Sequence, residues 1–86
     1  MSRPITELDL LLAAELDHAR DMLVMMGDEL ANDFAVVSRH GLSLQAVDIV
    51  GQLLGHIAAV VRADDRPAAV QQIGMCDLKA KLSQAA

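Results

Sequence analysis

Two residues with chemically useful side chains stand four positions apart in the middle of the chain. Asp48 and Gln52 carry a carboxylate and an amide, and residues at this spacing are neighbours on one face of a helix. The amide could orient a water molecule for in-line attack on an acyl phosphate, while the carboxylate pairs with a lysine of another protein. Positioning supplies most of the acceleration for so labile a bond. Gln52 and Asp48 are therefore the candidate catalytic pair of a phosphatase.

The helical face that holds this pair continues with small and polar residues. It runs on to Gly55, Ala59 and Arg62, which we predict to form a face for docking a partner. This face is expected to point away from the apolar stripe of the same helix, which consists of Val47, Val50, Leu54, Ile57 and Val61. An ordinary solvated helix face accounts for the same residues, because such pairs also arise by chance.

The segment around this pair resembles the chemotaxis phosphatase family called CheZ. Asp48, Gly51 and Gln52 match the Asp-x-x-x-Gln motif of that family, in which Gly often precedes the Gln. The resemblance implies a helical hairpin that dimerises into a four-helix bundle. It also implies that Gln52 orients the water and that Asp48 docks a response regulator. The chain is far shorter than the usual members of the family, and its third predicted helix has no clear counterpart there.

Other residues that could do chemistry are isolated. Glu15 and His18 have the Glu-x-x-His spacing of a di-metal site, which needs a second such motif and further inward carboxylates. They flank the apolar stripe of their helix, so we predict a solvated face and no metal site. Phosphotransfer typically uses an exposed mid-helix histidine followed closely by Lys and Gly. His40 precedes Gly41 but is expected to end a helix, and His56 is followed by Ile57 and Ala58, so we interpret both as capping or surface residues. The sequence contains no phosphate loop or dinucleotide motif, and we expect no cofactor.

The elements that must position these residues are helices. Apolar residues recur at spacings of three and four, which predicts helices over about 7–40, 44–63 and 66–84. Thr6 is the expected N-cap of the first helix. Gly41 is expected to end that helix in a left-handed conformation, and Ser43 to begin the next, which gives an antiparallel hairpin. Gly27 should mark a close-packing point or a bend.

A third helix is expected after a short break. The boundary Asp64-Asp65-Arg66-Pro67, with an aspartate as N-cap and Pro67 in the first turn, predicts its start near Arg66. Its apolar residues lie on two sides, so it should touch two neighbours. The expected fold is therefore all-α, with a long hairpin and a shorter third helix in one domain spanning residues 1–86.

Composition restricts the class of function. The chain has 86 residues, a net charge of −5, a single aromatic residue and 53% hydrophobic residues. Scattered cations and few aromatics exclude a nucleic-acid surface. The only cysteine, Cys76, and the absence of a long uninterrupted apolar run lead us to expect a cytoplasmic protein that does not cross a membrane. So small a chain cannot hide this much apolar surface alone, which predicts self-association as a homodimer or larger bundle.

These observations lead to two hypotheses about function. The first is a helical interaction and oligomerisation module with no intrinsic catalysis, whose partner is a second copy of itself. The second is a phosphatase that acts on the aspartyl phosphate of a response regulator. They differ in whether the face of Asp48 and Gln52 is open to a partner.

Overall fold

Thr6 begins the first helix, as the sequence predicts. The computed structural model describes residues 4–85, and helix α1 covers Glu7–Ala31. The Thr6 hydroxyl accepts a hydrogen bond from the Asp9 backbone N–H at 3.1 Å, and the Asp9 carboxylate accepts one from the Thr6 N–H at 3.1 Å. This capping box satisfies two backbone donors that would otherwise lack partners at the end of the helix.

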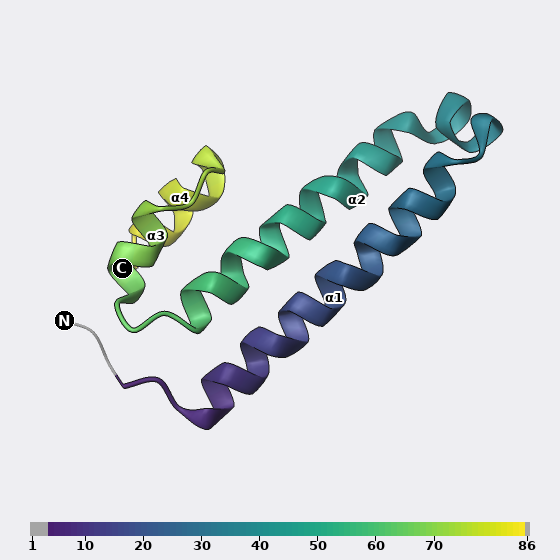
Figure 1. The fold of residues 1–86 in the computed structure, drawn as a ribbon. Coiled ribbons are helices and arrows are strands. Elements are labelled where there is room, and N and C mark those ends of the chain that lie inside the picture. The colour runs from purple at the N-terminus through teal and green to yellow at the C-terminus, as the bar shows by residue number, and fades with distance from the viewer. Residues whose placement is uncertain (1–3, 86) are drawn as a thin grey trace.

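The turn between the first two helices lies at Asn32 and Asp33. Helix α2 covers Phe34–Val61 and begins where an Asp33 carboxylate oxygen accepts hydrogen bonds from the N–H groups of Ala35 at 2.9 Å and Val36 at 3.4 Å. The two helices then run antiparallel as a long hairpin (Figure 1). The hairpin is as expected, but its turn comes earlier in the chain than predicted.

Gly41 does not end a helix, so that prediction is wrong. It lies inside α2, and no residue from 4 to 85 has a positive φ. The chain bends instead at His40, whose φ of −128° and ψ of 29° are not helical, and the helix continues through Ser43. Asp33, and not Ser43, is the N-cap of α2. The non-helical His40 separates residues 34–39 from the rest of α2, directly before the predicted stop at Gly41.

The predicted third helix is two short helices. Helix α3 covers Arg66–Gln71, and its start is confirmed: the Asp65 carboxylate accepts a hydrogen bond from the Ala68 N–H at 3.1 Å. Helix α4 covers Cys76–Ser83, after a break that contains Gly74, a poor helix former. The buried side chains here are Val70, Ile73 and Leu78, packed with Leu53, Val60, Met75 and Leu82.

The described part of the chain is all-helical and forms a thin slab. Its extents are 50 × 26 × 14 Å. Helix α2 lies between α1 on one side and α3 with α4 on the other (Figure 1). By length and composition α2 is long and apolar enough to cross a membrane, and 11% of its most apolar window is buried inside the structure. Residues 1–3 and 86 of the predicted domain lie outside the described part.

Small residues line the contact between α1 and α2. Ala13 on α1 and Gly51 and Ala58 on α2 are buried. A Cβ added at Gly27 would lie 3.5 Å from a methyl group of Val47. Of the two alternatives predicted for Gly27, a close-packing point or a bend, the structure therefore has the close-packing point. The apolar stripe predicted for the first helix includes Leu12, Met26, Leu30, Phe34 and Val37, and all of these are exposed, as is Val50 of α2. Helices approach most closely where side chains are small. Because the small residues face the other helix, the large apolar side chains point out of the plane that contains the two helix axes.

Candidate functional site

Asp48 and Gln52 both lie exposed on α2, one helical turn apart. Asp48 also lines an open pocket of about 280 Å³ between α1 and α2. Across this pocket stands Asp28 of α1, and Gln45 lines it from the same side as Asp48. The floor is apolar and is formed by Leu23, Val24, Gly27, Ala31, Leu44 and Val47. Asp48 therefore lies at the edge of an open pocket that a partner could enter, and Gln52 lies one helical turn further along α2, outside the residues that line the pocket.

Two of the three predicted docking residues contact the neighbouring helix α1. A Cβ added at Gly55 would lie 3.4 Å from Cδ and Nη1 of Arg20, so the Arg20 side chain covers Gly55. The Arg62 guanidinium pairs with the Asp17 carboxylate of α1. Ala59 is exposed. Of the three residues predicted to dock a partner, Gly55 and Arg62 therefore contact α1 and Ala59 is open to solvent.

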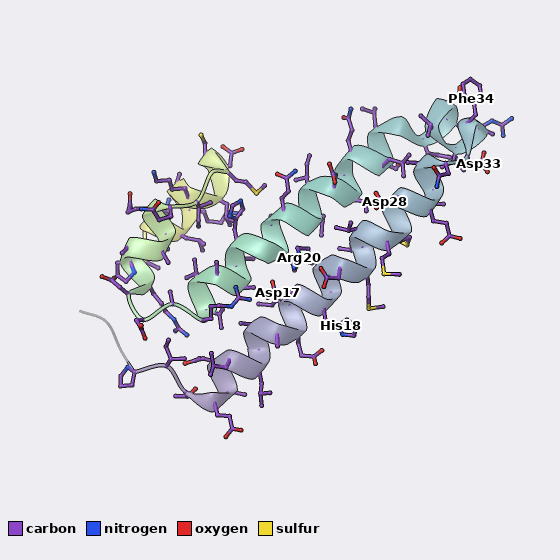
Figure 2. The ribbon with its side chains drawn as sticks, in the orientation of Figure 1. Asp17, His18, Arg20, Asp28, Asp33 and Phe34 are labelled. Carbon is purple, nitrogen blue, oxygen red and sulfur yellow. The ribbon has the colours of Figure 1, made fainter. Side chains whose placement is uncertain are left out.

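Arg20 is the centre of a charge network between the helices. Its guanidinium lies 3.1 Å from the carboxylates of both Asp17 and Asp21, and Asp17 also binds Arg62. Figure 2 places Asp17 and Arg20 between the two ribbons. The two glycines Gly51 and Gly55 give the Arg20 stem room to lie along α2, because a larger side chain at either position would meet it.

The side of the hairpin that holds Asp48 and Gln52 is polar and acidic. A helix turns about 100° per residue, and α1 faces α2 through Ala13 and Gly27. From this contact, Asp21 and Asp28 lie about 100° round the helix, on the side that also carries Asp48 and Gln52 in α2. Asp28 and Asp48 share one pocket, which agrees with this geometry. Carboxylates here attract a cationic side chain and repel a phosphoryl group that lacks its own cations.

The histidines and the predicted Glu-x-x-His pair lie apart from other residues that could ligate a metal. His18 Nδ1 lies 4.0 Å from a Glu15 carboxylate oxygen, with both side chains largely exposed. Figure 2 places His18 on the edge of α1 that faces away from α2. His40 is exposed at the bend of α2, and His56 is half-buried. Within residues 4–85, no three His, Cys, Asp or Glu side chains are grouped to hold a metal ion.

The sequence did not identify the residues that join the elements. Arg66 lies 3.0 Å from the buried carboxylate of Asp9 and donates a hydrogen bond to the Val61 carbonyl at 3.0 Å. It thereby ties the start of α1, the end of α2 and the start of α3. The spacing of Asp17 and Arg20 is a recognisable helical ion pair, but the partners of Asp9 and Asp17 lie far along the chain, and no sequence signal pairs them.

Comparison with known proteins gives no relative. No family model matches the chain, and no curated protein and no solved structure matches it either.

Proposed function

We propose that this protein is a cytoplasmic helical interaction module that associates with itself and performs no catalysis of its own. The observation that carries the proposal is the distribution of its large apolar side chains. Fourteen of them are exposed, and within residues 4–85 no large side chain is fully buried. Large apolar patches on the surface of a soluble protein mark interaction sites, and this many exposed leucine, valine, methionine and isoleucine side chains favour such a site.

The hairpin also lacks a core of its own. The buried hydrophobic residues at its contact are the two alanines Ala13 and Ala58, and the larger buried cluster of residues 4–85 lies under α3 and α4. Burial of apolar surface stabilises a fold by about 25 cal/mol per Å². Alanine side chains bury little area, so they contribute little stability. A chain of 86 residues with this packing gains most by burying its exposed leucines and methionines against a partner.

The test of self-association is the mass of the protein in solution. Sedimentation equilibrium between low and high micromolar concentration should give at least twice the chain mass of 9.2 kDa. A single species of 9.2 kDa with full helical circular dichroism across that range would overturn the proposal.

Phosphatase action on a response regulator is the second candidate. It is supported by the exposure of Asp48 and Gln52 on successive turns beside an open pocket. In this scheme the Gln52 amide orients a water for attack on phosphorus. The phosphorus–oxygen bond to the receiver aspartate breaks, and the products are inorganic phosphate and the free carboxylate. Asp48 pairs with a receiver lysine, a contact that the acidic surroundings favour.

This second candidate is tested by loss of phosphate from receiver domains of the same organism. The wild-type protein should accelerate the loss for one of them, and Gln52→Ala should abolish the acceleration without changing the helical content. Gln45→Ala is the matched control, because Gln45 is an exposed amide on the same side of α2. The phosphatase hypothesis is excluded if no receiver is dephosphorylated faster, or if Gln45→Ala and Gln52→Ala have the same effect.

A further inference from the structure

Large apolar side chains line one side of α1 at helical spacing. Leu8, Leu12, Ala19, Met26 and Leu30 recur at steps of four and seven, which places them on one face. All five are exposed. Within this span the charged Glu15 flanks the face, about 40° from its central line, whereas the opposite side of the helix carries Asp21 and Asp28.

A second apolar line runs along α2. Val50, Leu54, Ile57 and Val61 recur at steps of four, three and four. Val50 is exposed and the other three are half-buried, although none belongs to the buried cluster under α3 and α4. These residues were predicted as the core stripe of the helix, but the contact with α1 uses Gly51, Gly55 and Ala58 instead.

The two lines lie on the same side of the hairpin. In each helix the apolar line is centred about 100° from the side that contacts the other helix, in the same rotational sense along the chain. Because the helices run antiparallel, equal rotations turn both lines to one face. We call the face formed by these nine residues the apolar face: Leu8, Leu12, Ala19, Met26, Leu30, Val50, Leu54, Ile57 and Val61.

The slab provides no second layer to cover this face. The smallest extent of the molecule is 14 Å, and α3 and α4 lie beside α2 rather than over the hairpin (Figure 1). Stable domains are built from at least two packed layers around a core. The apolar face is therefore one half of such a core.

The size of the face suits a second copy of the chain. Helix α1 is about 37 Å long, and two helices side by side are about 20 Å wide, which gives a face of about 750 Å². Two copies would bury about 1,500 Å², within the range of stable interfaces of about 1,200–2,000 Å². A two-fold pairing needs a surface that complements itself, and a nearly uncharged apolar face does so without opposing like charges.

We infer that two copies stack their hairpins through the apolar face, forming a two-layer bundle around one shared core. This inference rests on the self-association proposed above and specifies its surface. It also leaves the acidic side with Asp48 and Gln52 facing outward on both copies, so that a further partner can reach the pocket beside Asp48.

A matched pair of substitutions on α1 tests the surface. Leu12 and Leu10 are exposed to nearly the same extent, 49% and 52%, but only Leu12 belongs to the apolar face. Leu12→Lys should raise the dissociation constant of the dimer at least about 100-fold, because it buries a charge at the interface. Leu10→Lys should leave the constant within about threefold, as is usual for residues outside an interface. Both variants are measured by sedimentation equilibrium, with circular dichroism to confirm the fold.

A measurement on the unaltered protein guards against variants that fail to fold. Met26 lies on the apolar face, whereas its neighbour Met25 lies outside it and is 71% exposed. Peroxide converts exposed methionines to sulfoxides, and mass spectrometry separates the two positions. As the concentration rises through the dimerisation range, oxidation of Met26 should slow several-fold while that of Met25 should not.

The outcomes separate this inference from the proposal of self-association. If the wild-type protein dimerises, Leu12→Lys dimerises equally well and Met26 is not protected, the apolar face is not the interface. Self-association then still stands. A wild-type monomer at every concentration overturns both. Binding of the monomer to phosphatidylcholine vesicles, with Met26 protected only there, would identify lipid as the occupant and overturn the pairing of two copies.

Discussion

Asp17 on α1 accepts a hydrogen bond from the guanidinium of Arg62, the C-cap residue of α2, although the two residues are 45 positions apart in the sequence. Asp17 also lies 3.1 Å from Nη1 of Arg20, whose side chain covers Gly55. The two halves of the hairpin are thus joined by charge where their contact is made of glycine and alanine. This network fixes which residue of α1 stands opposite which residue of α2.

Removing the charge of Asp17 should cause a small and salt-dependent loss of stability. Asp17→Asn is expected to lower the free energy of unfolding by about 0.5–1 kcal/mol, because the pair is partly exposed and therefore screened. A double-mutant cycle with Arg62→Met in urea titrations isolates the pair. The coupling should fade at about 1 M NaCl, and a coupling that persists unchanged there would contradict the assignment.

Asp33 should be the residue that sets the turn of the hairpin. Asp33→Ala removes the acceptor for the N–H groups of Ala35 and Val36, and loss of such a cap costs about 1 kcal/mol. Asp64→Ala removes another exposed aspartate that caps no helix, so it should change the thermal midpoint little. If the two variants shift the midpoint equally, net charge rather than capping is responsible.

Gly41 should tolerate a side chain. It lies inside α2 without a positive φ, and an added Cβ would meet no atom within 4 Å. Gly41→Ala is therefore expected to raise the free energy of unfolding by up to about 1 kcal/mol, because alanine is the better helix former. Chemical denaturation at one fixed protein concentration measures the change. A loss of stability would place the turn at Gly41 after all.

Gly51 should resist a large side chain that its neighbour accepts. Gly51 is buried against Arg20 and Val24 of α1, so Gly51→Leu must push the helices apart and should cost about 1–3 kcal/mol. Gln52→Leu adds apolar bulk at an exposed position of the same helix and should change stability by less than about 0.5 kcal/mol. The ratio of the two effects, measured by thermal unfolding, reports which side of α2 faces α1.

The sequence alone determined the helical character of the chain and several helix ends. Thr6 and Asp65 were identified as N-caps because a side-chain acceptor before an apolar periodic run satisfies local backbone donors. The cap at Asp33 could have been found by the same signal. It was missed because the periodic apolar pattern continues through Phe34 and Val37, and Gly41 offered a second plausible stop.

Only the tertiary structure decided which face of each helix is inside. Apolar residues cover a broad arc of both long helices, so periodicity fixes the helix but not its rotation about its own axis. The rotation follows from contacts distant in sequence: Gly27 against Val47, and Arg20 over Gly51 and Gly55. For the same reason the sequence placed Asp48 and Gln52 correctly on an exposed helical turn but assigned Gly55 and Arg62 to an open surface. Those two residues contact α1, because a glycine accepts a neighbouring side chain closely and an arginine reaches a carboxylate that only folding brings near.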